Sequence, residues 1–467
     1  MAAHAIAAWQ WLLLAGCVSA SAYAMVAAVA MPFFGARRGG GQGRGQGRGR
    51  RPGAVRPSSV AVPSFTSLTS LTSLPCYSFA DVGVSVLKPL CGAEPRLYEN
   101  LRTFCEQRHG RFQLVLGVSS PDDPAIAVVR RLQAAYPRCD IELAIDTRVH
   151  GSNLKVSNLI NMAEHARHDV IVIADSDIAV QADYLDSVAA PLADPRVGVV
   201  TCLYVARGVG GFWPRVGALF INEWFAPSVR VAHAAGSRRF GFGATLALRR
   251  ATLERIGGFG ALKDCLADDY WLAEHVRALG LPTVLSRVMV ATDVIEPTFA
   301  ALWQRETRWL RTIRSVNPLG FLSLPVTFTS PWLMAGAWLA GTLAAAPRGA
   351  HAWTMEWAAA ASVAATLAGG IARLLLHWRA ARHERTFWRD LPLVPLRDTL
   401  LMFQWLAGAF GSHVTWRGMR VPVEASAAGS AFSATSATAS TPHVSNPHAA
   451  TPGAINILDV METSDGG

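Results

Sequence analysis

Short apolar runs rich in β-branched residues alternate with longer amphipathic stretches through the middle of the chain. The runs that indicate β-strands are residues 84–87, 112–118, 141–145, 170–174 and 197–204. Helices are expected between them at residues 95–108, 122–135 and 154–166. Strand, helix and strand in this order predict an α/β fold, with a mostly parallel sheet covered on both faces. Ligands bind such sheets at the carboxyl ends of the strands, so residues that follow a strand are the first candidates for chemistry.

Three long apolar stretches flank this α/β region. The first, residues 5–34, is nearly uncharged and long enough to cross a bilayer, and Trp9 and Trp11 are placed as interface anchors. A cleaved signal peptide is disfavoured, because the stretch is too long and its basic residues follow it. Residues 319–346 and 353–376 are the other two candidate spans.

The charges around the later stretches predict their orientation. The loop between the two spans holds one charge, Arg348, whereas residues 373–389 are rich in Arg and His. By the positive-inside rule the second loop is cytoplasmic, so the two spans form a hairpin that enters and returns. The apolar run 399–411 is too short to cross a bilayer and is interpreted as an interfacial or re-entrant helix.

The composition also indicates a membrane protein. Of 467 residues, 51% are hydrophobic and only 16% are charged, which is unusual for a soluble enzyme. The net charge of +10 includes seven arginines within residues 37–56, in a Gly/Gln/Arg run directly after the first apolar stretch. We interpret this run as a positive-inside flank. RNA binding is the alternative, but no aromatic stacking platform accompanies the run, so no nucleic-acid partner is expected.

These features divide the chain into six segments. They are an N-terminal transmembrane helix (1–35), a low-complexity basic and Ser/Thr linker (36–80), the α/β domain (81–318), a transmembrane hairpin (319–377), a basic loop with the interfacial or re-entrant helix and a closing segment (378–423), and a disordered tail (424–467). The seven cysteines are scattered and lack metal-ligand spacing, so they are interpreted as reduced thiols in a cytosolic compartment.

The first candidate site is Asp175-Ser176-Asp177, directly after the fourth expected strand. Two carboxylates two residues apart in a turn suit one divalent cation that bridges a diphosphate. An all-oxygen site of this kind favours Mg²⁺ or Mn²⁺. A solvated turn is the alternative, because Asp and Ser favour turns.

The second candidate is Asp268-Asp269, which opens an apparent helix at residues 270–279. Acidic residues at this position also stabilise a helix through its dipole, which is the structural alternative. In the functional interpretation Asp269 is a general base, ionised at neutral pH and close to an acceptor hydroxyl.

Arg305 and Arg308 form the third candidate, with Trp309 beside them. The two arginines are about one helical turn apart, so both side chains can point the same way. Arginines just before a membrane span also meet lipid headgroups, which is the alternative. Two fixed guanidinium groups are equally suited to a leaving diphosphate.

Two further groups lie at strand ends. Lys155, with Asn153 and Asn158, precedes the strand that leads to Asp175, and Asp122-Asp123-Pro124 follows the second strand. Each group either stabilises its loop alone or forms part of a surface that binds a nucleotide.

Taken together, these motifs resemble the processive and lipid-acceptor glycosyltransferases of the GT-A fold, family 2, and in particular the ceramide glucosyltransferase-like branch. The matching segments are Val84 to Gly92, Asp122 to Ile126, Asp175 to Asp177, Leu266 to Tyr270, Arg305 to Trp309, and the closing Val414-Thr415-Trp416-Arg417-Gly418. Coverage runs from about Val84 to Pro318, with the membrane hairpin in addition.

The resemblance implies a Rossmann-like GT-A domain that transfers a sugar with inversion. It assigns catalysis to Asp269, Arg305, Arg308 and Trp309, nucleotide-sugar binding to Asp122, Asp123, Lys155, Asp175, Gly243 and Asp268, and the divalent cation to Asp175 and Asp177. It also implies a multi-pass protein of the cell inner membrane with a cytoplasmic catalytic domain. The Arg/Gly run and the C-terminal tail are not part of the family pattern and receive no catalytic role.

Within this branch, residues 200–204, 220–225 and 240–245 look most like the bacterial hopanoid biosynthesis-associated glycosyltransferases. That resemblance implies UDP-N-acetylglucosamine as donor and a bacteriohopanetetrol-type lipid as acceptor. One alternative is a ceramide glucosyltransferase, which uses UDP-glucose. Another is a non-catalytic membrane scaffold that binds nucleic acid through its Arg/Gly run. The helix expected at residues 214–233 either lies at the membrane surface beside the acceptor or packs in the core.

Overall fold

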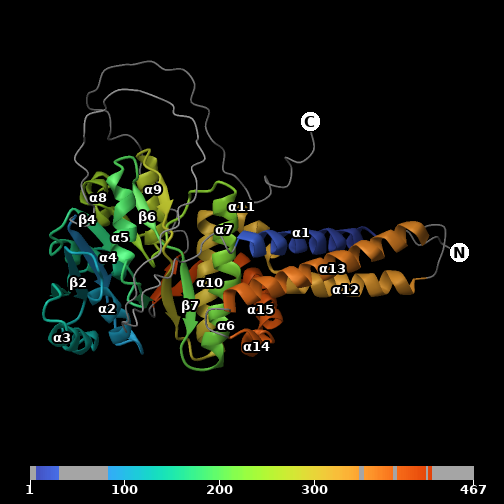
Figure 1. The fold of residues 1–467 in the computed structure, drawn as a ribbon, viewed down its shortest axis with the longest axis horizontal. Helices are drawn as coiled ribbons and strands as arrows, with labels where there is room; N and C mark the ends of the chain where they lie inside the picture. The colour runs from blue at the N-terminus through green and yellow to red at the C-terminus, as the bar shows by residue number, and fades with distance from the viewer. Residues whose placement is uncertain (1–6, 31–81, 347–351, 382–385, 417–418, 423–467) are drawn as a thin grey trace, which may run out of the picture.

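The computed structural model describes residues 7–30, 82–346, 352–381, 386–416 and 419–422. A domain of sheet and helices occupies one end of the molecule, and a bundle of long helices projects from it (Figure 1). The linker predicted at residues 36–80, with its Arg/Gly run, and the tail predicted at 424–467 lie outside the described residues.

A seven-stranded sheet forms the centre of the α/β domain, in the order β3-β2-β1-β4-β8-β6-β9. Its strands are β1 (Val84–Pro89), β2 (Phe112–Val118), β3 (Ile141–Ile145), β4 (Val170–Ile173), β6 (Val199–Thr201), β8 (Leu246–Arg249) and β9 (Thr283–Leu285). The β1–β2, β1–β4, β2–β3 and β6–β9 pairs are parallel, whereas β8 runs antiparallel to β4 and β6. The predicted α/β class with a mostly parallel sheet is confirmed, and β8 is an antiparallel strand that the sequence pattern did not reveal.

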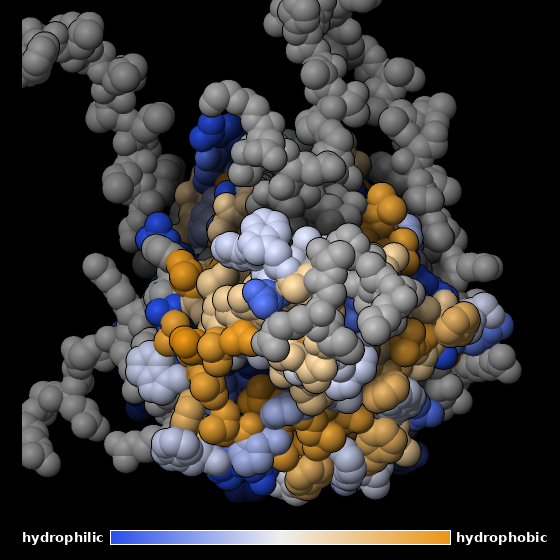
Figure 2. Space-filling model, turned by 90° about the vertical axis from the view of Figure 1, so that its right-hand side faces the viewer, coloured by the Kyte–Doolittle hydropathy of each residue, from blue (hydrophilic) through white to orange (hydrophobic). Residues whose placement is uncertain are grey.

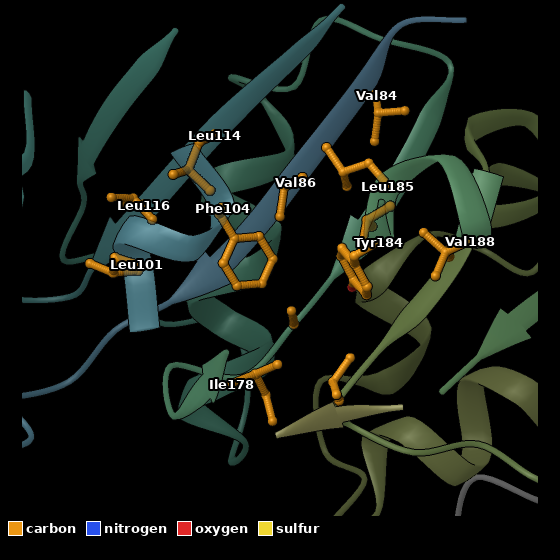
Figure 3. Packing of buried hydrophobic residues seen from close by; sticks show 14 of the residues in the cluster. Val84, Val86, Leu101, Phe104, Leu114, Leu116, Ile178, Tyr184, Leu185 and Val188 are labelled. Carbon is orange, nitrogen blue, oxygen red and sulfur yellow. The ribbon is translucent and has the colours of Figure 1, made fainter. Parts of the chain in front are cut away.

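Side chains of each strand alternate between two hydrophobic cores, one on each face of the sheet. The helices that contribute to these cores are α2 (Leu97–Cys105), α3 (Ala125–Ala135), α4 (Leu154–Ala163), α5 (Tyr184–Ala189), α8 (Arg250–Arg255) and α9 (Asp268–Ala278). On one face Val84 and Val86 of β1 pack with Phe104 and Tyr184 (Figure 3). On the other face Leu87 packs with residues of α4 and α9. The sheet is therefore covered on both sides, as the pattern predicts.

A second, three-stranded sheet lies beside the first, in the order β5-β10-β7. Its strands are β5 (Ile178–Ala179), β7 (Tyr204–Gly208) and β10 (Val290–Val294). The single strand expected at residues 197–204 is wrong, because the chain leaves the main sheet after β6 and enters the second sheet as β7. Cys202 and Leu203 connect the two strands and are themselves buried, so the apolar run continues through the break and hides it.

Three long helices form the projecting bundle: α1 (Ala8–Ala30), α12 (Thr329–Ala345) and α13 (Ala352–Ala381). Small residues allow them to approach closely, as is common between helices in lipid. Ser21 Oγ donates to the carbonyl oxygen of Ala365 at 2.8 Å, and Ser362 Oγ donates to that of Gly336 at 2.7 Å. A Cβ atom at Gly336 would lie 2.4 Å from Cys17 Sγ, so no larger residue fits there without a shift.

Among the described residues, α1 and α13 are the helices long and apolar enough to cross a membrane. Apolar side chains gather on the face seen from the end of the bundle (Figure 2). The span expected at residues 319–346 is not a single helix in the structure. The structure divides it into α11 (Pro318–Ser323), a 3-10 turn (Leu324–Thr327) and the 17-residue α12. Pro325 lacks the backbone donor that a continuing α-helix requires at that position.

The remaining helices join the two parts of the molecule. They are α6 (Phe212–Phe220), a π-helical turn (Ile221–Phe225), α7 (Ala226–Ala234), α10 (Phe299–Val316), α14 (Phe387–Asp390) and α15 (Leu393–Ala409), followed by the hairpin of β11 (His413–Trp416) and β12 (Met419–Pro422). The apolar run 399–411 is therefore the second half of a longer helix. Its Arg397, Asp398 and Gln404 are buried, so α15 presents a polar face to other helices.

Candidate active site

Three charged side chains from separate segments meet beyond the carboxyl end of β4. Lys155 lies in the first turn of α4, Asp175 follows β4 and Asp268 begins α9. Lys155 Nζ is 2.7 Å from Asp175 Oδ1 and 3.2 Å from Asp268 Oδ2. Burial lowers the pKa of Lys155, but Asp175 and Asp268 outweigh the burial and hold this pKa above its usual value. The structure thus brings together three residues predicted to contact the nucleotide sugar.

The start of α4 is held in place by Asn153. Its side chain accepts a hydrogen bond from the backbone N–H of Val156 at 3.1 Å and thereby caps the helix. The same side chain donates to the carbonyl oxygen of Cys265 at 2.8 Å. This bond ties the first turn of α4, which carries Lys155, to the segment that precedes Asp268.

Asp269 is partly buried at the start of α9 and faces a glycine loop. Its Oδ2 accepts a hydrogen bond from the backbone N–H of Gly243 at 2.8 Å, and its Oδ1 accepts one from the N–H of Tyr270 at 2.8 Å. Burial, followed by the neighbouring charge of Asp268, raises the pKa of Asp269 to about 6, while Lys155 acts in the opposite direction. Such a carboxylate is ionised at neutral pH and is more basic than an ordinary aspartate.

Gly243 brings the backbone close to the charged groups. A Cβ atom at this position would lie 2.8 Å from Asp175 Oδ2 and 3.4 Å from Lys155 Nζ. A glycine therefore keeps the backbone close to these two side chains without a clash, and its contact with a nucleotide sugar stays a prediction.

Asp177 points toward the second sheet, where its Oδ2 accepts a hydrogen bond from Thr292 Oγ1 at 2.6 Å. Beneath it, the fully buried Lys88 donates to the carbonyl oxygen of Asp175 at 2.7 Å. Burial raises the pKa of Asp177 and lowers that of Lys88, and the charge of each opposes the shift of the other. The sequence analysis did not single out Lys88; its one signal is a lysine inside the apolar strand β1.

A second group that the sequence analysis missed supports the same turn. Asn100 Nδ2 donates to the carbonyl oxygen of Asp177 at 3.2 Å and to Asp293 Oδ2 at 2.9 Å. Arg207 Nε donates to Asp293 Oδ1 at 3.0 Å. These residues come from α2, β10 and β7, so no local sequence motif connects them.

Asp123 shapes the loop after β1 rather than facing the acidic residues. Its carboxylate accepts hydrogen bonds from the N–H of Gly92 at 3.0 and 3.1 Å and from the N–H of Ala125 at 2.8 Å. It thereby joins the loop after β1 to the start of α3. Asp122 precedes Asp123 in the loop after β2 and is exposed. The contact of both residues with a nucleotide stays a prediction.

Arg305, Arg308 and Trp309 lie in α10 with different environments. Arg305 Nη1 forms an ion pair with Glu296 Oε2 at 2.7 Å, and the guanidinium carbon lies 5.1 Å from the centre of the Trp309 ring. Burial and the charge of Arg305 lower the pKa of Arg308, whereas the charges of Asp269 and Asp175 act to raise it. Within the described residues the Arg308 side chain has no hydrogen bond or ion pair, so it is the guanidinium available to an anionic ligand.

The acidic residues suit a divalent cation whose coordination is completed by a bound ligand. In the part of the chain that the structure describes, no three His, Cys, Asp or Glu side chains form a metal cage. Asp175 and Asp177 offer two carboxylates on one turn. Mg²⁺ and similar cations are commonly held by one or two carboxylates together with substrate phosphates and water, so this donor set suits such an ion.

Several known proteins are similar to this chain. Ceramide glucosyltransferase 1 of Caenorhabditis elegans is 26% identical over 237 residues, which cover 50% of this chain and 51% of that protein. Ceramide glucosyltransferase of Pyricularia oryzae is 34% identical over 110 residues, covering 20% of this chain and 22% of that protein. The chain therefore spans about half, or less, of the length of these relatives.

Solved structures give weaker similarities. The mannosyltransferase PcManGT from Pyrobaculum calidifontis, in complex with GDP-Man and Mn²⁺, has a TM-score of 0.41 and 22% identity, covering 70% of this chain and 88% of that chain. GalNAc-T7 with UDP, GalNAc and Mn²⁺ has a TM-score of 0.35 and 10% identity, covering 52% of each chain.

The family assignment rests on a longer match. The description "Glycosyl transferase family 21" matches residues 60–428, which include the whole α/β domain, α12, α13 and α15. This match agrees with the ceramide glucosyltransferase-like branch expected from the motifs, but the family is 21 and not the family 2 that the motifs suggested. The chain belongs to Glycosyl transferase family 21.

Proposed function

We propose that this protein is a membrane-bound inverting glycosyltransferase that moves N-acetylglucosamine from UDP-N-acetylglucosamine to a hydroxyl group of a bacteriohopanetetrol-type hopanoid. One observation carries the proposal: Asp269, partly buried and with its pKa raised to about 6, lies at the start of α9 beside the Lys155–Asp175–Asp268 cluster. The proposed base and the residues proposed to bind the diphosphate thus lie close together.

Asp269 is the proposed general base. It takes the proton from the acceptor hydroxyl while the hydroxyl oxygen attacks the anomeric carbon and the bond from that carbon to the diphosphate breaks. A single displacement inverts the configuration, so an α-linked donor gives a β-linked product. The N–H groups of Gly243 and Tyr270 fix the carboxylate, and each oxygen keeps a lone pair for the proton.

The departing UDP carries the negative charge that develops in this step. Arg308 is the proposed guanidinium for the diphosphate, because its side chain is free of ion pairs within the described residues. Arg305, which pairs with Glu296 and lies over the Trp309 ring, is proposed together with Trp309 to assist departure of the diphosphate and placement of the acceptor. Asp175 and Asp177 are the proposed holders of Mg²⁺ or Mn²⁺, which when bound stabilises the charge on the leaving diphosphate.

The nucleotide itself is proposed to lie along the carboxyl ends of β1, β2 and β4. Lys155, Asp268 and Gly243 border this edge from one side, and Asp122 and Asp123 border it from the loop after β2. Ligands of open α/β sheets bind at this edge, which supports the placement.

The apolar helices support a lipid acceptor. Helices α1 and α13 are long and apolar enough to cross a membrane, and α12 packs with them. We place the protein in the cell inner membrane, with several passes, and the α/β domain on the cytoplasmic side, where UDP-sugars are available.

A direct assay tests the proposal. Purified protein in detergent is incubated with UDP-N-acetylglucosamine, UDP-glucose or UDP-galactose, each with bacteriohopanetetrol or ceramide, and products are identified by mass spectrometry. The expected product is a β-linked N-acetylglucosaminyl hopanoid. Absence of any glycosylated lipid from all six mixtures, with folded protein, contradicts the proposal.

Ceramide glucosyltransferase activity is the second candidate. It is favoured by the curated relatives, several of which are ceramide glucosyltransferases. The same assay separates the two functions, because this candidate predicts glucosylceramide from UDP-glucose and no hopanoid product.

A further inference from the structure

A cavity of about 440 Å³ lies between α10 and the segment that follows α15. Its wall from α10 includes Trp303, Gln304, Thr307 and Arg308, and residues 411–414 form the opposite side. None of the lining residues comes from the main sheet or from the loops that carry Lys155 and Asp175. The cavity therefore lies apart from the edge proposed for the nucleotide, and Arg308 connects the two.

The wall of the cavity includes polar side chains that have no hydrogen-bond partner among the described residues. Thr307 is 5% exposed, and its hydroxyl oxygen is buried without a hydrogen-bond partner among the described residues. A buried hydroxyl group of this kind costs free energy unless a ligand or water satisfies it. The side chain of Arg308, at the same wall, also has no hydrogen bond or ion pair within the described residues. Arg308 thus offers a guanidinium to whatever enters, and the adjacent Thr307 carries an unpartnered hydroxyl in the same wall.

The opposite wall is built rigidly. Arg311 donates to the carbonyl oxygens of Phe410 at 3.1 Å and His413 at 2.8 Å, which holds the segment against α10. Gly411 has φ of +90°, and a Cβ atom there would lie 2.9 Å from Arg311 Nη2. The cavity is consequently a formed site and not a gap between independent segments.

A second hollow, of about 540 Å³, adjoins the cavity and shares Trp303 and Gln304 with it. Its other lining residues are Phe299, Ala300 and Ala301, all apolar. Phe299 is 40% exposed, which is high for a phenylalanine beside a polar cavity. A polar chamber that continues into an apolar surface matches a molecule with a hydroxylated head and a hydrocarbon body.

We propose that these two hollows bind the lipid acceptor, with its hydroxylated head in the chamber of Thr307 and Arg308 and its hydrocarbon against Phe299, Ala301 and Trp303. This inference rests on the proposed function, and it assigns acceptor recognition to residues outside the acidic motifs. Arg308 then contacts the acceptor side and the diphosphate side of the reaction together.

The test separates the Michaelis constants of the two substrates. In Thr307→Val the shape is retained and the hydroxyl is lost, so the KM for the lipid acceptor rises about 5- to 10-fold while the KM for the UDP-sugar is unchanged. Thr307→Ser restores the hydroxyl and returns the acceptor KM to within about twofold of the wild type. Thr312→Val is the matched control, because Thr312 donates to the Arg308 carbonyl and does not line the cavity.

A second variant tests the apolar hollow. Ala301→Trp fills it, so transfer to the full lipid falls about tenfold, whereas transfer to a water-soluble polyol without hydrocarbon is unchanged. Equal effects on both acceptors, or a Thr307→Val variant that changes only the donor KM, overturn the inference. If wild-type protein glycosylates no lipid at all, the proposed function fails instead, and the two failures remain distinct.

Discussion

Two groups of charged side chains in this molecule, one partly exposed and one buried, are built in opposite ways. The acidic cluster (Asp175, Asp177, Asp268 and Asp269) lies at the end of the main sheet. The junction network (Glu223, Arg373, His377 and Asp398) lies where the helix bundle joins the α/β domain. The acidic cluster has more negative than positive side chains, whereas each carboxylate of the junction network is paired with a cationic side chain.

The junction network is closed on itself. Arg373 of α13 is 2.6 Å from Glu223 Oε2 and 3.0 Å from Asp398 Oδ1. His377 Nδ1 is 2.6 Å from the other oxygen of Glu223, and Ser330 Oγ donates to the other oxygen of Asp398 at 2.6 Å. Both carboxylates thus have partners at each oxygen, and the network joins α13, α15 and the π-helical turn.

The acidic cluster is left open. Four carboxyl groups lie near Lys155 and Lys88. Burial, followed by the charge of a neighbouring carboxylate, raises the pKa values of Asp177 and Asp269. A closed network stabilises one arrangement of helices, whereas an open one keeps capacity for a cation and a substrate. The comparison teaches that buried charge alone does not mark an active site; incomplete pairing does.

Breaking the junction network is expected to have the largest effect. In Arg373→Met the buried carboxylates of Glu223 and Asp398 lose their shared cation, so the free energy of unfolding falls by about 3–5 kcal/mol. Chemical denaturation in detergent micelles measures this change. Arg196→Met is the control, because Arg196 pairs with Asp194 at the surface and its loss costs about 1 kcal/mol or less. Equal losses in the two variants would show that the junction is no more than a surface pair.

The acidic cluster should respond in the reverse sense. Asp175→Asn removes one charge from a cluster with excess negative charge, so the free energy of unfolding changes little, while kcat for sugar transfer falls about 100-fold or more. Parallel denaturation and transfer assays measure the two quantities. Asp183→Asn, at an exposed aspartate, should leave both unchanged. A large loss of stability in Asp175→Asn would mean that this cluster, too, is structural.

The open cluster also predicts a pH dependence. The carboxyl of Asp269 must be ionised to act as base, and its raised pKa of about 6 means that it becomes protonated as the pH falls through that value. Relative to the plateau above pH 7, kcat/KM should be about tenfold lower at pH 5. Asp268, Lys155, Asp175 and Arg308 are the charged groups that act on it. A profile that stays flat down to pH 5 is inconsistent with Asp269 as the base.

The smallest expected effect concerns the glycine loop. In Gly243→Ala the new Cβ atom would lie 2.8 Å from Asp175 Oδ2 and displace it from Lys155, so kcat should fall about fivefold. Gly260→Ala is the matched control, because a Cβ atom at Gly260 meets nothing within 4 Å. Identical activities of the two variants would remove the steric argument for Gly243.

The fold was predictable where local pattern and tertiary context agree. Strands β2 and β3 begin and end at the predicted residues, since each is an isolated apolar run between polar segments. The break between β6 and β7 was not predictable, because the buried connection is as apolar as the strands. Strand β8 was missed for a related reason: its short apolar run lies in a loop-rich segment, and its antiparallel pairing depends on distant strands.

The site was predictable in its acidic motifs and not in their support. Asp175 follows an expected strand and Asp268 opens an expected helix. A parallel α/β sheet places residues of both kinds at one edge. Lys88, Asn100 and Asp293 were missed, because their contacts depend on burial and on three separate elements. Arg397 in α15 was missed as well, because the apolar pattern of the sequence does not predict that this arginine is buried.

The most direct test of the account measures donor binding and sugar transfer together in Asp269→Asn. The variant keeps the shape of the side chain and loses its basicity, so it should bind UDP with an unchanged Kd while transfer to the lipid falls by about 100-fold or more. Wild-type transfer by Asp269→Asn, with UDP binding retained, would contradict the central claim that this carboxylate is the base.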